Sequence, residues 1–143
     1  MRQDLPISSY EDEILRAVKY NRVVIIKAET GAGKSTQVPQ FLLKLKGVPK
    51  VVVTQPRRIA ATSIAQRVAE EMKCEIGGIV GYRTSLDRKD SDKTQLLFCT
   101  DGLELVCELF GDNPREGILV IDEVHEWNLN IEILVAWVRH RLK

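Results

Sequence analysis

Two glycines, a lysine and a hydroxyl group stand near residue 30 in a spacing that suits phosphate binding. The residues are Ala28, Glu29, Thr30, Gly31, Ala32, Gly33, Lys34, Ser35 and Thr36. They match the phosphate-loop pattern Gly-x-x-x-x-Gly-Lys-[Ser/Thr] except at Ala28, a position that can start the turn without a positive φ. Gly31 and Gly33 let successive backbone N–H groups face one anion. Lys34 can reach the β- and γ-phosphates of a nucleotide, and the Ser35 hydroxyl can bind Mg²⁺.

The alternative is a glycine turn that only links a strand to a helix. The required order of strand, loop and helix is present, which favours phosphate binding by residues 29–36.

A second candidate lies where an apolar run ends in acids. After Ile118–Ile121 come Asp122, Glu123, Val124 and His125. The carboxyl ends of parallel strands form the edge where such sheets bind ligands, so Asp122 can meet Lys34. We predict Asp122 as a Mg²⁺ ligand, and Glu123 as the base that activates water and a further metal contact. A solvated acidic loop is the alternative, but the phosphate loop upstream favours the site and a catalytic His125 that senses the γ-phosphate.

Two arginines follow the second apolar run. Thr54 ends the run, Pro56 breaks it, and Arg57 and Arg58 stand where a helix is expected to begin. A helix N-terminus offers N–H donors and positive potential, which suit a nucleic-acid phosphate. A solvated helix start is the alternative, and only the other motifs favour a function here.

Regular elements must bring these groups together. Four continuous apolar runs, which do not alternate, predict strands buried on both faces of a parallel sheet: Val23–Ile26, Val51–Val53, Leu96–Cys99 and Ile118–Ile121. Helical spacing is present over residues 61–72, 103–110 and 131–142, and Ser8 with Glu11 resembles a capping box for a helix to Lys19. The order predicts an α/β fold, a parallel sheet flanked by helices on both faces. Residues 87–93 and 111–117 are expected to form loops.

Composition excludes several classes of protein. The 143 residues are 44% hydrophobic and 29% charged, which fits one globular domain. No apolar run approaches the roughly 20 residues that span a bilayer, so no membrane partner is expected. A net charge of +1 argues against a dedicated nucleic-acid clamp but not against a local basic patch. Three cysteines without Cys-x-x-Cys spacing predict reduced thiols and an intracellular, cytoplasmic location: Cys74, Cys99 and Cys107.

Taken together, these segments resemble the motifs of the DEAH-box (DExH) RNA helicases of superfamily 2. Residues 28–40 are similar to motif I, residues 54–61 to motif Ia, residues 100–102 to motif Ib and residues 122–126 to motif II. The resemblance implies a RecA-like P-loop NTPase fold, with residues 1–143 as part of the first RecA-like, ATP-binding domain. It also implies an enzyme that binds Mg²⁺ and ATP and hydrolyses ATP to ADP and phosphate, which drives movement along single-stranded RNA.

The resemblance extends to single residues of the nucleic-acid and base contacts. Arg57, Arg58, Thr100 and Asp101 are expected to touch the RNA backbone, which implies salt-sensitive binding without sequence preference. Arg67 is similar to the family arginine that stacks on adenine. The preference for RNA over DNA rests on the resemblance, because no residue here reads a 2′-hydroxyl unambiguously.

The sequence departs from the family pattern at two places. Ser85 and Leu86 stand where many members have Arg and Phe, and Trp127 stands where an arginine usually follows the acidic box. Both changes concern auxiliary nucleic-acid or interdomain contacts, and the nucleotide residues are intact. We expect Trp127 to be buried against the last helix.

The chain ends at Lys143, before a motif III and a second RecA-like domain. An inserted arginine is worth roughly 10³–10⁵ in rate, so residues 1–143 alone are expected to hydrolyse ATP very slowly. Because the motif III strand normally lies between the motif I and motif II strands, we expect a gap, direct pairing of those two strands, or a second copy in that place. We therefore expect a fragment of a longer helicase that is marginally stable or self-associating.

Two other functions stay open from the sequence. One is a non-catalytic module in which ATP only switches a partner surface. The other is a P-loop NTPase that translocates on DNA.

Overall fold

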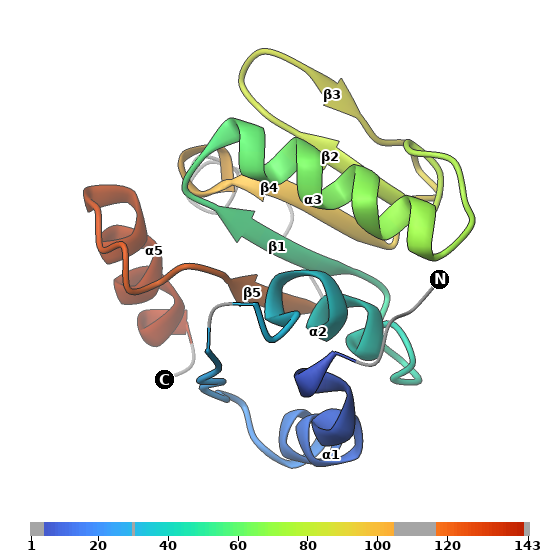
Figure 1. Cartoon of the computed structure of the whole chain (residues 1–143). Helices are drawn as coiled ribbons and strands as arrows, with labels where there is room; N and C mark the ends of the chain where they lie inside the picture. Colours follow the sequence, from blue (N-terminus) through green and yellow to red (C-terminus); the bar gives the residue numbers. More distant parts are fainter. Residues whose placement is uncertain (1–4, 30, 105–116, 142–143) are drawn as a thin grey trace.

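The computed structural model describes residues 5–29, 31–104 and 117–141. In these residues the strands form one mixed β-sheet, against which helices pack. Figure 1 shows the helices and strands, which in chain order are the 3-10 helix η1 (Pro6–Tyr10), α1 (Glu11–Tyr20), α2 (Lys34–Leu42), β1 (Val51–Gln55), α3 (Arg58–Glu71), β2 (Val80–Arg83), β3 (Arg88–Lys89), β4 (Leu96–Thr100), β5 (Ile118–Ile121) and α5 (Leu129–Arg141). Residues 101–104 are also helical.

Among the described residues the sheet has five strands in the order β3-β2-β4-β1-β5. β1 lies between β4 and β5 and is parallel to both, with Val53 opposite Phe98 of β4 and Val120 of β5. β2 is parallel to β4, and β3 pairs antiparallel with β2. The predicted α/β fold with a mainly parallel sheet is therefore confirmed.

Alternate residues of the central strands enter two separate cores. Val51 and Val53 pack with Phe98 in the larger core, together with side chains of α2 and α3 such as Phe41. Val52 joins a smaller core on the other face, formed with Leu97, Cys99, Leu103 and Leu119. Every residue of β1 is buried, as expected for a strand covered on both faces.

Helix α3 lies across β1, β2 and β4 on the face of the larger core, with α2 beside it (Figure 1). Its buried residues at helical spacing include Ala61, Ala65 and Ala69, whose small side chains let the helix approach the sheet closely. The predicted helices at residues 61–72 and 131–142 are thus confirmed as α3 and α5. On the second face, residues 101–104 begin the helix predicted for residues 103–110, and residues 105–110 lie outside the described part of the chain.

The predicted strand Val23–Ile26 is wrong. These residues have no regular secondary structure, and the Val23 and Ile25 side chains are 62% and 87% exposed. A strand needs a neighbour with which to exchange backbone hydrogen bonds. Among the described residues no strand pairs with the outer edge of β5, so the direct pairing of this run with β5 does not form.

Three smaller expectations also change. The capping box of Ser8 and Glu11 does not form, because η1 comes first and α1 begins at Glu11 without a side-chain cap. The expected loop at residues 87–93 contains the short strand β3, and the loop predicted for residues 111–117 lies outside the described residues except for Gly117. Within the described residues, Cys74 and Cys99 are not in a disulfide bond. The helices described are too short or too polar to span a bilayer.

Candidate functional site

The glycine-rich loop ends at the first turn of α2. Gly31 and Gly33 have φ of +87° and +93°, so both take the backbone conformation for which glycine is needed. A Cβ atom at Gly33 would lie 2.6 Å from Leu5 Cδ1 and 3.1 Å from Leu5 Cβ, so a larger residue would also force the Leu5 side chain to shift. Lys34 is the first residue of α2, so the loop delivers its backbone N–H groups and its lysine to one helix N-terminus. Thr30 lies outside the described residues.

The acidic residue after β5 reaches the phosphate loop. The Ser35 hydroxyl donates a hydrogen bond of 2.6 Å to Asp122 Oδ2, across 87 positions of sequence. Asp122 is 6% exposed, and its position continues the pairing of β5 with β1 through a bond from its N–H to the Thr54 carbonyl oxygen. The structure thus brings together Ser35 and Asp122, two of the three residues predicted as Mg²⁺ ligands. Hydroxyl and carboxylate oxygens beside a helix N-terminus are the donor set that a phosphate-bound Mg²⁺ takes.

Gln55 is a site residue that sequence reasoning missed. Its Nε2 donates to Asp122 Oδ2 at 2.5 Å, and its side chain is 1% exposed. The Glu123 N–H donates to the other oxygen, Oδ1, at 2.9 Å. Three donors therefore fix the Asp122 carboxylate. The signal lies in the strand order, because β1 and β5 are neighbours that end side by side.

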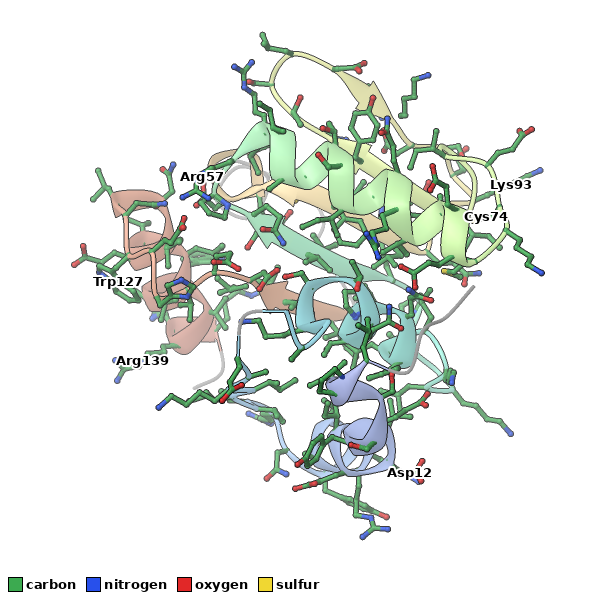
Figure 2. The ribbon with its side chains drawn as sticks, in the orientation of Figure 1. Asp12, Arg57, Cys74, Lys93, Trp127 and Arg139 are labelled. Atoms are coloured by element: carbon green, nitrogen blue, oxygen red, sulfur yellow. The ribbon has the colours of Figure 1, made fainter. Side chains whose placement is uncertain are left out.

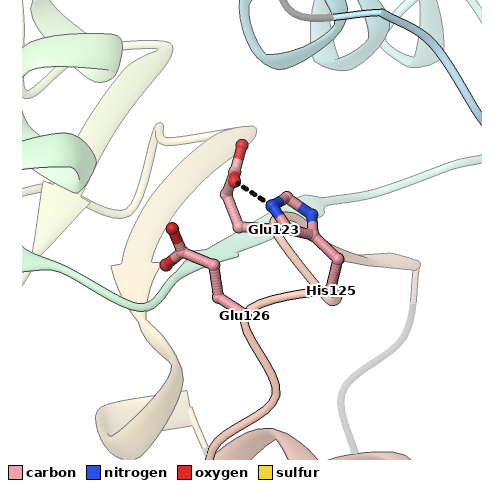
Figure 3. A group of neighbouring side chains, drawn as sticks. All are labelled: Glu123, His125 and Glu126. Carbon is pink, nitrogen blue, oxygen red and sulfur yellow. Dashed lines mark ion pairs between the residues drawn. The ribbon is translucent and has the colours of Figure 1, made fainter.

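The backbone turns sharply after Asp122, and Figure 3 shows the side chains that the turn brings together. Glu123 has φ of +57°, a left-handed conformation that costs a non-glycine residue on the order of 1 kcal/mol. Its Oε2 lies 3.2 Å from His125 Nε2. Ligand atoms of Glu123, His125 and Glu126 all lie within 4.8 Å of one another. The predicted catalytic residues Glu123 and His125 are thus in contact, and the predicted metal role of Glu123 stays a prediction.

The predicted nucleic-acid residues Arg57, Arg58 and Thr100 gather at the carboxyl ends of β1 and β4. Gln55 and Thr100 are register partners, Arg57 precedes α3, and Arg58 is its first residue. The Arg57 side chain is 67% exposed and forms an ion pair of 2.6 Å with Glu126. The basic corner and the acidic turn after β5 are therefore in direct contact.

Asp101, also predicted to touch RNA, is only 4% exposed. Its carboxylate accepts hydrogen bonds from the side-chain amides of Asn128 at 3.1 Å and Asn130 at 3.5 Å. Asn128 in turn accepts a bond from the Ile131 N–H and so caps α5. The burial of Asp101 argues against a direct RNA contact and indicates that it anchors the start of α5.

Arg67 lies on the polar face of α3, as predicted. Its side chain is 66% exposed, and its Nε is 3.4 Å from Glu71 Oε2. A guanidinium held through Nε keeps its terminal N–H groups and its planar face free for stacking.

Comparison with known proteins decides the family. The sequence model of the DEAD/DEAH box helicases matches residues 8–142. The chain belongs to the DEAD/DEAH box helicase family. Its fold is accordingly that of a RecA-like helicase domain, as the motifs predicted.

Several curated relatives of this helicase chain are RNA helicases by name. A probable ATP-dependent RNA helicase spindle-E of Culex quinquefasciatus is 41% identical over 147 residues, covering 99% of this chain and 10% of that protein. The protein of the same name from Aedes aegypti is 41% identical over 144 residues, covering 96% and 10%. A DExH-box ATP-dependent RNA helicase of Arabidopsis thaliana is 40% identical over 149 residues, covering 99% and 15%. The chain thus spans 10–15% of the length of these relatives.

Two positions at which this chain departs from the family pattern are exposed. Trp127 is 55% exposed, so the prediction of a buried tryptophan is wrong. The buried residues of α5 are instead Ile131 and Leu134, the first of which lies four positions after Trp127. Leu86 is 76% exposed at the turn between β2 and β3.

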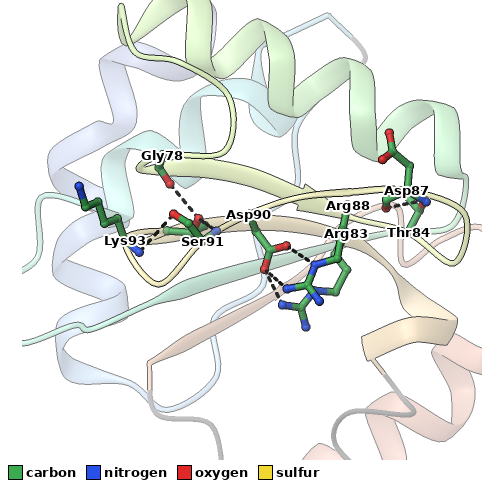
Figure 4. A network of polar contacts seen from close by, with 9 residues as sticks. Gly78, Arg83, Thr84, Asp87, Arg88, Asp90, Ser91 and Lys93 are labelled. Atoms are coloured by element: carbon green, nitrogen blue, oxygen red, sulfur yellow. Dashed lines mark hydrogen bonds and ion pairs between the residues drawn. The ribbon is translucent and has the colours of Figure 1, made fainter.

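The β2–β3 turn of the helicase domain is fixed by the polar network in Figure 4. The Asp90 side chain is 3% exposed and pairs with Arg83 and with Arg88, whose Nε is 2.9 Å from Asp90 Oδ1. Burial raises the pKa of the Asp90 carboxyl, but hydrogen bonds from the two arginines outweigh this effect and hold the pKa below its ordinary value. A hydrogen bond to Asp87, together with burial, raises the pKa of the Tyr82 hydroxyl.

Asp90→Asn should lower the free energy of unfolding by about 1–3 kcal/mol at pH 7, because it removes a buried charge that satisfies two arginines. A carboxyl whose folded pKa is lowered stabilises the fold above its ordinary pKa of 3.8, and this stability is lost as the pH falls through the folded pKa. Urea unfolding of the two proteins from pH 7 to pH 3 measures the difference. The difference in the free energy of unfolding between the wild type and Asp90→Asn should be largest at neutral pH and shrink below about pH 4. A difference that stays constant over this range would contradict the assignment.

Proposed function

We propose that the protein containing this chain is an ATP-dependent RNA helicase, and that this chain binds Mg²⁺ and ATP and contributes the catalytic base. The observation that carries the proposal is the 2.6 Å contact between Ser35 on α2 and Asp122 after β5. It joins the phosphate loop to the acidic turn in one site, although 87 positions separate the two residues. The names of the curated relatives support the same activity.

The nucleotide would bind through its phosphates at the N-terminus of α2. The backbone of residues 29–36 and the positive end of the helix dipole attract the anion, and Lys34 adds a full charge. Ser35 and Asp122 would hold Mg²⁺, which supplies positive charge beside the phosphates when bound. Gln55 keeps the Asp122 carboxylate in place for this role.

Glu123 would accept the proton of the attacking water. Its contact with His125 orients the carboxylate, and the sharp turn at Glu123 presents it beside Asp122, which binds the Glu123 N–H. His125 would respond to the terminal phosphate through the same contact. These roles are those predicted for the family motif from the sequence.

Single-stranded RNA would lie along the basic corner of Arg57, Arg58 and Thr100, at the carboxyl ends of β1 and β4. The exposed arginines suit phosphate contacts, which carry no sequence information. We propose RNA rather than DNA as the nucleic acid because the relatives are named RNA helicases. Tighter binding to DNA than to RNA in the test below would favour translocation on DNA instead.

Arg57→Ala and Arg58→Ala should each weaken RNA binding and lower the salt slope of log affinity by about 1, because each removes one phosphate contact. Lys93→Ala is the matched control, since Lys93 lies at the opposite end of the domain in Figure 2. Fluorescence anisotropy with matched RNA and DNA oligonucleotides over a salt series measures both effects. An unchanged slope in both arginine variants would remove the basic corner from the proposal.

A second RecA-like domain of the same protein would complete the ATP cleft. The exposed apolar side chains of Val23 and Ile25 and the outer edge of β5 support a further strand at this place, either from the same protein or from a second copy in self-association. An intracellular location also stays a prediction, which is supported by the absence of a disulfide at the described cysteines, Cys74 and Cys99.

A further inference from the structure

The last residue of α3 connects two parts of the nucleotide site that are far apart in sequence. Glu71 Oε1 accepts a hydrogen bond of 2.8 Å from Gln37 Nε2 on α2. Its other oxygen, Oε2, lies 3.4 Å from Arg67 Nε, one turn back on α3. The Glu71 side chain is 12% exposed, whereas the Arg67 side chain is 66% exposed, so the ion pair joins a largely buried carboxylate to an exposed guanidinium.

Gln37 belongs to the helix that begins in the phosphate loop. Its side chain is 1% exposed, and its Nε2 also lies 3.2 Å from the Thr36 hydroxyl oxygen. Its backbone N–H donates to the Gly33 carbonyl oxygen at 2.8 Å. A group that binds the Gln37 amide is therefore fixed relative to the phosphate loop.

The fold does not need a carboxylate at this position. The C-terminal end of a helix carries the negative end of the dipole, so an acid at the end of α3 is placed unfavourably. Partial burial adds a desolvation cost, which the hydrogen bond from Gln37 and the ion pair with Arg67 offset only in part, because Glu71 Oε2 accepts no hydrogen bond from the described residues. An uncharged residue could fill the space between α2 and α3 at a lower free-energy cost. We therefore expect the negative charge of Glu71 to have a function other than packing.

We propose that Glu71 is a positioning residue that fixes the Arg67 guanidinium relative to the phosphate loop, and so sets where the nucleotide base is held when its phosphates are bound. This inference rests on the proposed function and on the contact of Arg67 with adenine that the family resemblance predicts. An exposed arginine samples many rotamers, and ordering it before the nucleotide arrives removes part of the entropy cost of binding. Because Glu71 contacts Nε, the planar face stays open to the base.

Calorimetric titration of the full-length protein with Mg²⁺ and either ATP or inorganic tripolyphosphate tests the proposal, because tripolyphosphate carries the phosphates without a base. Glu71→Gln keeps the shape and the acceptor for Gln37 but removes the charge that holds Arg67. It should weaken ATP binding roughly three- to tenfold, as expected for releasing one long side chain, and leave tripolyphosphate binding unchanged. Arg67→Ala should do the same, and the double variant should be no weaker than Arg67→Ala alone.

Glu70→Gln is the matched control, since Glu70 is the exposed neighbour on the same helix and should bind both probes as the wild type does. If Glu71→Gln does not fold, Glu71→Asp can replace it, because aspartate keeps the charge but is too short to reach Arg67 in the same way. Glu71→Asp should also weaken ATP binding relative to tripolyphosphate binding. Equal weakening of ATP and tripolyphosphate binding by the Glu71 variants would overturn the inference and leave Glu71 as a structural link between α2 and α3. If Arg67→Ala leaves the ratio unchanged, the base contact of Arg67 is itself wrong, and the inference falls with it.

Discussion

Glu123→Gln should reduce the rate of ATP hydrolysis by the full-length protein by a factor of about 10²–10⁴, the usual contribution of a general base. Glutamine keeps the size of the side chain but cannot accept the proton of the attacking water. ATP affinity should stay close to that of the wild type, because Asp122, Ser35 and the phosphate loop are unchanged. Single-turnover hydrolysis and calorimetric ATP binding, measured on the same preparation, separate the two effects.

Glu126→Gln is the matched control for this experiment. Glu126 lies in the same turn, but its carboxylate pairs with Arg57. It should therefore keep turnover within a few-fold of the wild type while changing RNA affinity. A Glu123→Gln protein that lost hydrolysis but kept its biological function would favour the non-catalytic switch over the helicase.

Lys34→Ala should weaken ATP binding by a factor of about 10–10², because it removes a charge-assisted hydrogen bond to the phosphates. Lys34 starts α2 at the end of the glycine turn, so its ammonium group and the helix N-terminus act on the same anion. Hydrolysis should fall further than binding, by about 10²–10³, since charge develops on these oxygens in the transition state. Calorimetry and steady-state ATPase rates measure the two losses.

Lys44→Ala provides the comparison for that variant. Lys44 follows α2 and forms an ion pair with Glu11 on α1, at the other end of the helix from the phosphate loop. Its replacement should leave ATP binding unchanged. Equal ATP affinities for Lys34→Ala and the wild type would mean that the glycine-rich loop is only a turn.

Three of the strands, β1, β4 and β5, could be predicted from the sequence. β1 and β4 are buried and β5 is half-buried at the edge of the sheet, and all three met one condition, a continuous apolar run. Val23–Ile26 met it too, yet forms no strand here, because hydrogen-bonding partners belong to the sheet and are not visible in the run itself. β2 and β3 were missed because neither is a continuous apolar run: β2 contains a glycine and an arginine, and the two residues of β3 are charged and exposed.

The main contact of the site was predictable, and its supporting contacts were not. Ser35 and Asp122 meet because one begins a helix after the glycine turn and the other ends a parallel strand, and both positions are fixed by motif spacing. The bonds made by Gln55 and Glu71 depend on which strands and helices are neighbours. The burial of Asp101 likewise follows from where α5 begins.

The central claim is that Ser35 and Asp122 form one Mg²⁺ and ATP site. Calorimetric titration of the wild type and of Asp122→Asn with ATP, each with and without Mg²⁺, tests it directly. Asparagine keeps an oxygen for the Ser35 hydroxyl and removes the charge that Mg²⁺ requires. We predict that Mg²⁺ tightens ATP binding to the wild type by about tenfold or more, as one charge-assisted metal contact would, and that most of this gain is lost in the variant. The same gain in both proteins would show that Asp122 does not bind the metal, and would contradict the proposed site.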